Sequence, residues 1–236
     1  MLAGAGMNRF FKYVLRTRDV SAATAFYAAV LGRDDAEIYE LHEGAVARGA
    51  RPHWLGFLQV PGLDAAAAAF AARGAMPLGP KWINPEGLEG TVLRDPGGAV
   101  VALGRQAPPG APLPRPEVLW HALNTVDVER AKTNYAQLFG WEFEAATDLG
   151  HHGVIHPFAW RAGDPPVGSL SDLAERPGVH PHWLFFFKVA ALDPALETVR
   201  AAGGAVIGPS TLPSGGRVAV CDDPQGAAFA LLESRS

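Results

Sequence analysis

The sequence predicts an α+β protein made of four βαβββ modules in series, two in each half of the chain. Three repeated features lead to this prediction. A strand of alternating aromatic and other apolar residues occurs around Trp54 and again around Trp183. A strand that ends at Asp19 and leads into a helix is repeated 108 positions later at Asp127. The closing turn that contains Pro96 is repeated 128 positions later.

Hydrophobic periodicity and capping residues define the elements of the first half. Asp19 or Ser21 is suited to begin the first helix, and Gly32 is suited to end it, because glycine readily adopts a left-handed conformation. The strands within 36–48 are expected to turn at Glu43-Gly44. The predicted elements are, in order, a strand at residues 10–19, a helix to residue 32, two short strands within 36–48, the strand around Trp54, a helix at 63–73 and a hairpin at 91–103.

A proline-rich segment divides the chain. Five prolines fall within residues 106–116, which predicts a semi-rigid extended linker rather than part of a core. The predicted domains are therefore residues 8–105, a degenerate copy, and residues 117–236. The second half repeats the element order with 21 additional residues between its first helix and the Trp183 strand.

Length, charge and cysteine content exclude several functional classes. The 236 residues suffice for two small domains, and the net charge of −4 comes without a basic stripe, so we expect no nucleic-acid partner. The single cysteine, Cys221, cannot form an intrachain disulfide, which indicates a reducing compartment. The sequence shows no signal peptide and no apolar run long enough to span a membrane, so we expect a soluble cytoplasmic protein without a membrane partner.

Together these motifs resemble the vicinal oxygen chelate superfamily, which includes glyoxalases, bleomycin-resistance proteins and extradiol dioxygenases. The second half resembles its tandem glyoxalase-like members in particular. The resemblance implies two glyoxalase-like domains with cupped mixed β-sheets, and a small-molecule ligand; an enzyme of this type would be a lyase or a dioxygenase. The residues that carry the resemblance are Leu119 to Asp127, Phe11 to Asp19, Tyr135 to Trp141, the Trp183 strand and the turn Asp223 to Gly226.

The resemblance also implies where a divalent metal would be bound. Enzymes of the superfamily place His or Glu on the inner faces of the first strand, the Trp183-type strand and the last strand. Such a cation needs oxygen or nitrogen donors, usually three from the protein. We therefore expect no cofactor at these positions, which hold Trp120, Leu184 and Ala230 in the second half and Lys12, Leu55 and Ala102 in the first.

Strand register decides this expectation. A shift of one residue would turn His121 inward in place of Trp120, because side chains alternate between the two faces of a strand. Histidines outside the family positions leave an alternative open, in which a metal-dependent lyase or dioxygenase uses ligands that the family does not use. These histidines are His151, His152, His156 and His182.

The inner face expected in the second half is mostly apolar with a few polar groups, as in small-molecule sites. Either the aromatic rings leave a pocket or they fill the cup as core. His182 at the rim could act as an acid, a base or a hydrogen-bond donor, and a metal-free enzyme would use it with Asn124 or Tyr135. The expected lining residues are Trp120, Ala122, Asn124, His182, Leu184, Phe186, Ala228 and Ala230.

The inner face expected in the first half carries two cations, Lys12 and Arg16, with His53 and Phe57. A cation in a partly apolar cup is unfavourable unless it is paired, so an anionic ligand would suit this face. The alternatives are that both cations reach solvent or pair with Glu37 or Glu40.

The leading hypothesis is a protein that binds a small organic molecule in a β-sheet cup, without a family-type metal. The metal-dependent enzyme and the metal-free enzyme remain as alternatives. Because similar domains pair with each other, we expect either a monomer whose two halves pair or a homodimer.

Overall fold

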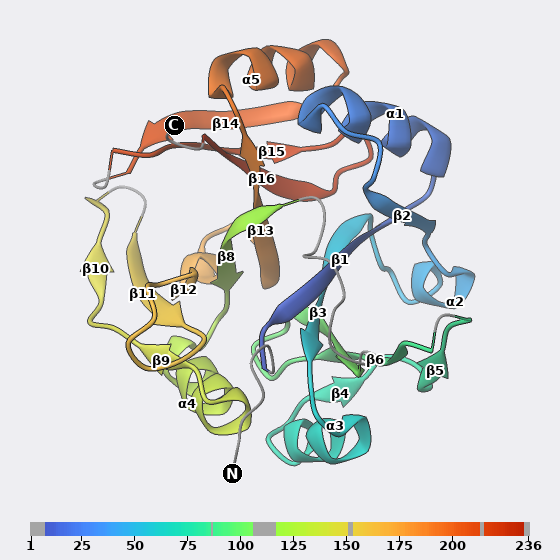
Figure 1. Ribbon diagram of the computed structural model, residues 1–236, viewed down its shortest axis with the longest axis vertical. Helices are drawn as coiled ribbons and strands as arrows, with labels where there is room; N and C mark the ends of the chain where they lie inside the picture. Colours follow the sequence, from blue (N-terminus) through green and yellow to red (C-terminus); the bar gives the residue numbers. More distant parts are fainter. Residues whose placement is uncertain (1–7, 86, 106–116, 151–152, 213–214, 234–236) are drawn as a thin grey trace. The chain divides into compact units, whose positions relative to one another are not determined.

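A computed structural model describes residues 8–85, 87–105, 117–150, 153–212 and 215–233, and it has an α+β fold (Figure 1). The predicted proline-rich linker lies outside the described residues. The elements of the first half are β1 (Phe10–Thr17), α1 (Val20–Leu31), β2 (Glu37–Glu40), α2 (Glu43–Val46), β3 (His53–Gln59), α3 (Leu63–Ala71), β4 (Met76–Pro77), β5 (Trp82–Ile83), β6 (Glu89–Arg94) and β7 (Val100–Arg105).

The second half repeats this order with an extended central part. Its elements are β8 (Val118–Asn124), α4 (Val128–Phe139), β9 (Glu142–Phe143), β10 (Thr147–Asp148), β11 (Val154–Ala159), β12 (Gly168–Ser171), the 3₁₀ turn η2 (Leu173–Glu175), β13 (His182–Val189), α5 (Leu192–Ala201), β14 (Ala205–Thr211), β15 (Arg217–Asp222) and β16 (Ala228–Glu233).

Strand pairing builds two mixed sheets from the described strands. The first has the order β2-β1-β3-β7-β6-β4, with β5 paired to β6. The second has the order β10-β11-β12-β8-β13-β16-β15-β14, with β9 paired to β11. In each sheet the first strand of a module runs parallel to the last strand of that module, as β3 does with β7 and β8 does with β12. This is the arrangement expected for glyoxalase-like βαβββ modules.

The first module departs from the prediction in one place. Residues 36–48 were expected to form two strands with a turn at Glu43-Gly44, but only β2 is a strand, and the helix α2 follows it. The reason is a local cap: Nδ1 of His42 accepts a hydrogen bond from the backbone N–H of Gly44, at 3.0 Å. A side-chain acceptor at this position satisfies a free donor of the first helical turn and so favours a helix over a hairpin.

The repeated aspartates begin equivalent helices, as the sequence predicts. Asp19 Oδ1 accepts from the backbone N–H of Ala22 at 2.9 Å, and Asp127 Oδ1 accepts from that of Arg130 at 3.0 Å. Gly32 ends α1 with a φ of 65°, the left-handed conformation that glycine tolerates. No helix among the described residues is long and apolar enough to cross a membrane.

By its contacts the chain divides into two compact units, and each combines segments of both sequence halves. Unit 1 contains the described residues of 8–12, 56–105 and 121–183, and unit 2 those of 13–55, 117–120 and 184–233. In unit 1, α3 packs on β6 and β7, and α4 packs on β12 and on α3. In unit 2, α1 lies beside α5, which covers β14 and β15 (Figure 1).

Aromatic rings form the core of each unit. In unit 1, Trp141 stacks on Phe158 with ring centroids 4.5 Å apart. In unit 2, Trp54 packs on Phe187 at 4.7 Å and on Tyr27 at 5.1 Å. All five rings are buried, and aromatic side chains of this size contribute much of the apolar area that stabilises a small core.

Each unit also contains a buried hydrogen-bond chain from tryptophan to tyrosine to aspartate. In unit 1, Trp183 Nε1 donates to the Tyr135 hydroxyl (3.4 Å), which donates to Asp95 Oδ2 (3.1 Å). In unit 2 the three positions are repeated: Trp54 Nε1 donates to the Tyr27 hydroxyl (3.0 Å), which donates to Asp223 Oδ2 (3.2 Å). In both of these hydrogen-bond chains, the aspartate belongs to the closing turn of one sequence half. The tyrosine and the tryptophan belong to the other half.

Candidate functional site

The candidate site lies in unit 1, on the face of the second sheet that carries Asn124 at the end of β8. Asn124 is paired with Ser171 of β12, and Ala122 is paired with Ser169, so these four side chains share one face. We call this surface, with His182, the Asn124 face. Asn124, Ser169 and Ser171 are between 4% and 6% exposed, which is low for side chains that end in amide or hydroxyl groups.

A hydrogen-bond chain joins three strands across this face. The Ser171 hydroxyl donates to Asn124 Oδ1 at 2.8 Å, and Asn124 Nδ2 lies 3.3 Å from His182 Nε2. On the other side of the ring, His182 Nδ1 lies 2.7 Å from the carbonyl oxygen of His180. Because an amide nitrogen can only donate and a carbonyl oxygen can only accept, the chain holds the proton of a neutral His182 on Nδ1 and the lone pair on Nε2.

The electrostatics keep this face uncharged. Burial lowers the pKa of His182; the His180 carbonyl opposes this change, and the neighbouring His180 ring adds to it. The imidazole is therefore neutral at neutral pH. Asn124 donates one amide N–H to His182 and retains a second, and the Ser171 oxygen retains its lone pairs. The face can thus offer a ligand both a donor and an acceptor without a net charge.

His121 points to the opposite side of β8. Its ring is stacked on Phe10 with centroids 5.1 Å apart, and its Nδ1 lies 2.8 Å from the carbonyl oxygen of Val167. Burial lowers the pKa of His121 to about 4, so it is neutral in the core of unit 1. The register of β8 with β12 therefore places Asn124 and His121 on different faces, and His121 does not take part in the Asn124 face.

The family-type metal positions of the second half lie in unit 2 and do not fit a divalent cation. Leu184 is 5% exposed and Ala230 is not exposed, and Trp120 offers only an indole N–H, which is a donor. None of the three can supply an electron pair to a metal. Among the described residues, no group of three or more His, Cys, Asp or Glu could hold an ion.

The alternative metal ligands are the histidines outside the family positions. His151 and His152 lie outside the described residues. His156 Nδ1 is buried and has no hydrogen-bond partner in the described part of the chain. The rings of His180 and His182 have centroids 4.9 Å apart, but both nitrogens of His182 are already engaged with Asn124 and the His180 carbonyl.

The remaining expected residues of the second-half cup lie in unit 2 and are apolar. Phe186 of β13 pairs with Ala230 of β16, and Leu184 lies two positions before Phe186 on the same face. Ala228 pairs with Asp222 at the end of β15. Trp120 is half-buried at the start of β8.

Tyr135 does not reach this site. Its hydroxyl is engaged in the core of unit 1 with Trp183 and Asp95, whereas His182 points to the other side of β13. Of the two partners considered for His182, the structure thus brings Asn124 to it and not Tyr135.

The corresponding face of the first sheet is filled by aromatic rings in unit 1. Phe57 is 1% exposed, and the rings of Phe11 and Trp82 lie 6.4 and 6.0 Å from it. Two glycines make room for these rings: a Cβ on Gly90 would lie 2.5 Å from Trp82, and one on Gly104 would lie 2.8 Å from Phe11. We call this surface the Phe57 face.

The polar residues expected near Phe57 have other surroundings. Lys12 is half-buried, and His53 Nδ1 lies 2.7 Å from the carbonyl oxygen of Arg51. Arg16, in unit 2, lies over the ring of Tyr39, with 5.1 Å between the guanidinium carbon and the ring centroid. Within the part of the chain that the structure describes, no ion pair joins Arg16 to Glu37 or Glu40.

Sequence reasoning missed the two serines. Ser169 and Ser171 lie in the insertion, which has no counterpart in the first half, so the repeat could not point to them. A local signal was present: in Gly168–Ser171, hydroxyl groups alternate with Leu170 in a short strand, a pattern that places both hydroxyls on one face.

The chain is similar in sequence to proteins of a known superfamily. A family model described as Glyoxalase/Bleomycin resistance protein/Dioxygenase superfamily matches residues 117–231. "Putative glyoxylase CFP32" of Mycobacterium tuberculosis is 30% identical, over 93% of this chain and 92% of its own length. "Anthracycline biosynthesis protein DauV" of Streptomyces sp. (strain C5) is 33% identical over 61% of this chain and 52% of its own length.

Solved structures match the fold of nearly the whole chain. The Mn(II)-bound glyoxalase from Novosphingobium aromaticivorans superposes with a TM-score of 0.62 at 14% identity, covering 97% of this chain and 82% of that one. A variant of homoprotocatechuate 2,3-dioxygenase from B. fuscum superposes with a TM-score of 0.65 at 14% identity, covering 100% of this chain and 74% of that one. At this identity the likeness concerns the fold alone.

Proposed function

Because the chain belongs to the glyoxalase/bleomycin resistance protein/dioxygenase superfamily, we propose that it binds a small uncharged organic molecule at the Asn124 face, without a metal ion at the family positions. The observation that carries the proposal is the hydrogen-bond chain from Ser171 through Asn124 to His182. It fixes the orientation of the amide and leaves one amide N–H and a hydroxyl oxygen for a ligand.

The class of ligand follows from these groups. A free amide N–H suits a carbonyl or ether oxygen, and the Ser171 oxygen suits a hydroxyl or N–H donor. Neither would compensate the desolvation of a charged group, so a neutral ligand is favoured over an ion. A compound with a carbonyl next to a hydroxyl would meet both groups at once.

One group of relatives suggests where to begin the search for ligands. The match to "Anthracycline biosynthesis protein DauV" points to polycyclic aromatic compounds, which carry neighbouring carbonyl and hydroxyl groups. We therefore propose anthracycline aglycones, which are uncharged, as the first compounds to test.

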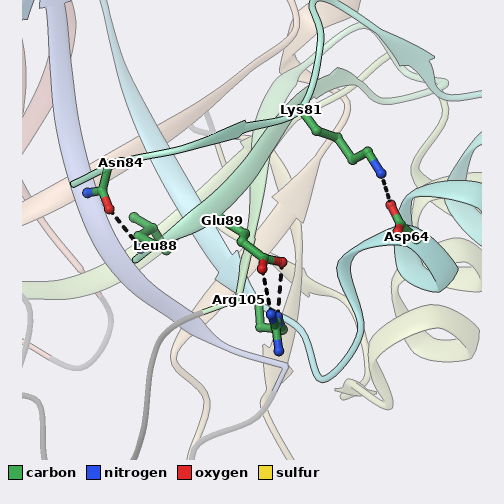
Figure 2. A network of polar contacts seen from close by, with 6 residues as sticks. All are labelled: Asp64, Lys81, Asn84, Leu88, Glu89 and Arg105. Carbon is green, nitrogen blue, oxygen red and sulfur yellow. Dashed lines mark hydrogen bonds and ion pairs between the residues drawn. The ribbon is translucent and has the colours of Figure 1, made fainter. Parts of the chain in front are cut away.

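Melting temperature in the presence of ligand tests the proposal. A ligand at about one hundred times its dissociation constant adds about 2.7 kcal/mol to stability, which corresponds to a shift of several degrees. We expect such shifts from uncharged compounds with the wild-type protein and no shift with Asn124→Leu. Asn84→Ala is a matched control, because it removes the carboxamide that accepts from the backbone N–H of Leu88, in a loop of unit 1 (Figure 2). Equal shifts in wild type and Asn124→Leu would contradict the proposal.

The alternative, a metal-dependent lyase or dioxygenase with non-family histidine ligands, is tested by metal analysis of protein purified without added ions. One tightly bound ion per chain, lost with His182→Ala, would favour that alternative. An ion content far below one per chain, together with ligand-induced shifts in melting temperature, would favour the metal-free binding protein.

A further inference from the structure

Arg16 of β1 is half-buried and lies against an aromatic ring. It lies directly opposite Tyr39 in the parallel pairing of β1 with β2, and its guanidinium carbon is 5.1 Å from the centre of the tyrosine ring. Both residues belong to unit 2. The contact is a cation–π interaction, which attracts the guanidinium group to the ring but satisfies none of its hydrogen-bond donors.

Three other arginines instead pair with carboxylates. Arg105 donates to both carboxylate oxygens of Glu89 (Figure 2), Arg33 to those of Asp35, and Arg217 to those of Asp193. In each pair the carboxylate raises the pKa of the arginine. These pairs lie at the surface, where they contribute little to stability.

Arg16 shows the opposite electrostatic signature. Burial lowers its pKa, and Tyr39 is the one neighbour that opposes this change; no carboxylate contributes. Within the described part of the chain, no hydrogen bond from Arg16 to a protein acceptor is present. A half-buried guanidinium group therefore presents up to five N–H donors that need acceptors from outside these residues.

The acidic side chain that contacts Tyr39 is already engaged. Glu37 Oε2 accepts a hydrogen bond from the Tyr39 hydroxyl at 2.9 Å, so this carboxylate has a partner on Tyr39 itself. Tyr39 is 45% exposed, so part of this residue is open to solvent.

We propose that Arg16 and Tyr39 form a binding site for a small organic monocarboxylate, which the guanidinium group holds through two parallel hydrogen bonds. The planar fork of arginine matches the geometry of a carboxylate, and the ring of Tyr39 holds that fork in place. A single negative charge balances the single positive charge of Arg16. The Glu37 carboxylate two residues from Tyr39 disfavours a dianion such as hydrogen phosphate.

The test uses sodium benzoate and the full-length ¹⁵N-labelled protein, followed through the NMR signals of the arginine Nε–H groups. The Arg16 signal is identified by its loss in Arg16→Lys. We expect benzoate to shift the Arg16 signal in a saturable way, with a dissociation constant on the order of 1 mM for two charge-assisted hydrogen bonds. Arg33, in its exposed pair, should show no saturable shift.

Variants separate the specific site from a general effect of charge. Arg16→Lys keeps the positive charge but loses the fork, so benzoate binding, followed through the backbone N–H of Tyr39, should weaken by about tenfold or more. Tyr39→Leu should also weaken it, because the ring no longer orients the guanidinium group. Arg33→Lys is the matched control and should bind benzoate as the wild type does. Circular dichroism and melting temperature check that each variant is folded.

Several outcomes would overturn the proposal. They are a linear, non-saturable shift at Arg16, an equal shift with sodium chloride at the same ionic strength, and unchanged benzoate binding in Arg16→Lys. Inorganic phosphate at slightly alkaline pH is mostly a dianion and should bind more weakly than benzoate. Tighter binding of phosphate would show that the assignment to monocarboxylates is wrong.

Discussion

Two equivalent strand pairs in unit 1 carry opposite kinds of surface. In each, the first strand of a βαβββ module runs parallel to the last, as β3 does with β7 and β8 with β12. The Phe57 face is covered by the rings of Phe11 and Trp82, whereas the Asn124 face carries an amide and hydroxyls joined by hydrogen bonds. The same backbone arrangement thus supports a packed surface in one module and a polar one in the next, and the side chains decide which.

The closing turns make a second comparison. Gln225 in unit 2 accepts from the backbone N–H of Asp19 at 2.8 Å and donates to its carbonyl oxygen at 2.8 Å, which ties the turn to the start of α1. The equivalent residue in unit 1 is Gly97, where a Cβ would lie 2.1 Å from the Thr125 hydroxyl. The turn of unit 2 is joined to the start of α1 by the long side chain of Gln225. The turn of unit 1 lies so close to Thr125 that it needs no side chain at Gly97.

The largest expected effect comes from opening the Phe57 face. Phe57→Ala removes a ring that is 1% exposed and leaves a cavity between Phe11 and Trp82. We expect a loss of about 3–5 kcal/mol in the free energy of unfolding, measured by urea denaturation. Phe57→Leu is the control and should lose less. A loss below about 1 kcal/mol for Phe57→Ala would show that this face is not a packed core.

The pH dependence of stability tests the Trp–Tyr–Asp chain of unit 1. Burial raises the pKa of Asp95 to about 6 from its ordinary 3.8, so the folded chain holds this proton more tightly than the unfolded chain. The resulting stabilisation is complete below pH 3.8 and is lost as the pH rises through about 6. Asp95→Asn lacks this titration. As the pH rises across that window, the free energy of unfolding of the variant should therefore increase relative to that of the wild type by up to about 3 kcal/mol.

Asp223→Asn serves as the matched variant in unit 2. Burial raises the pKa of Asp223 as well, so its pH dependence should change in the same direction. Urea denaturation at a series of pH values measures both. Curves for Asp95→Asn and wild type that run parallel from pH 3.8 to about 6 would contradict the assignment.

A smaller effect is expected from the Asn124 face. Asn124→Leu leaves the Ser171 hydroxyl and His182 Nε2 without their partner, which should cost about 1–2 kcal/mol in the free energy of unfolding. Adding Ser171→Ala should cost little more, because that hydroxyl has already lost its acceptor. A double-mutant cycle by urea denaturation measures this coupling. Additive losses would mean that the two side chains do not act together.

The smallest effect is expected at the turn of unit 2. Gln225→Ala removes exposed hydrogen bonds to the start of α1 and should cost about 1 kcal/mol. Gly97→Ala in unit 1 sharpens the comparison, since it forces Thr125 aside and should cost more than Gln225→Ala. Thermal unfolding of both variants checks the order, and the reverse order would show that the Gly97 turn can relax.

Much of the fold could be predicted because its signals are local or repeated. The caps at Asp19 and Asp127 and the end of α1 at Gly32 depend on residues within one turn of each helix. Period-2 alternation was sufficient to place Asn124 and His182 on a common face, away from His121. The exception is α2, which depends on the His42 cap. The residues around this cap have a pattern typical of strands, so the sequence did not predict the helix.

The sequence by itself therefore determined the modules, their caps and the alternation of side chains, because these depend on neighbours a few residues away. Only the tertiary structure decided that Ser171 is the partner of Asn124, that Trp82 covers Phe57, and that Arg16 lies on Tyr39 rather than in an ion pair. It also decided that each compact unit combines segments of both halves. The physical reason is that strand pairing and side-chain packing join residues far apart in the chain, and no local pattern encodes which distant side chain will cover a given face.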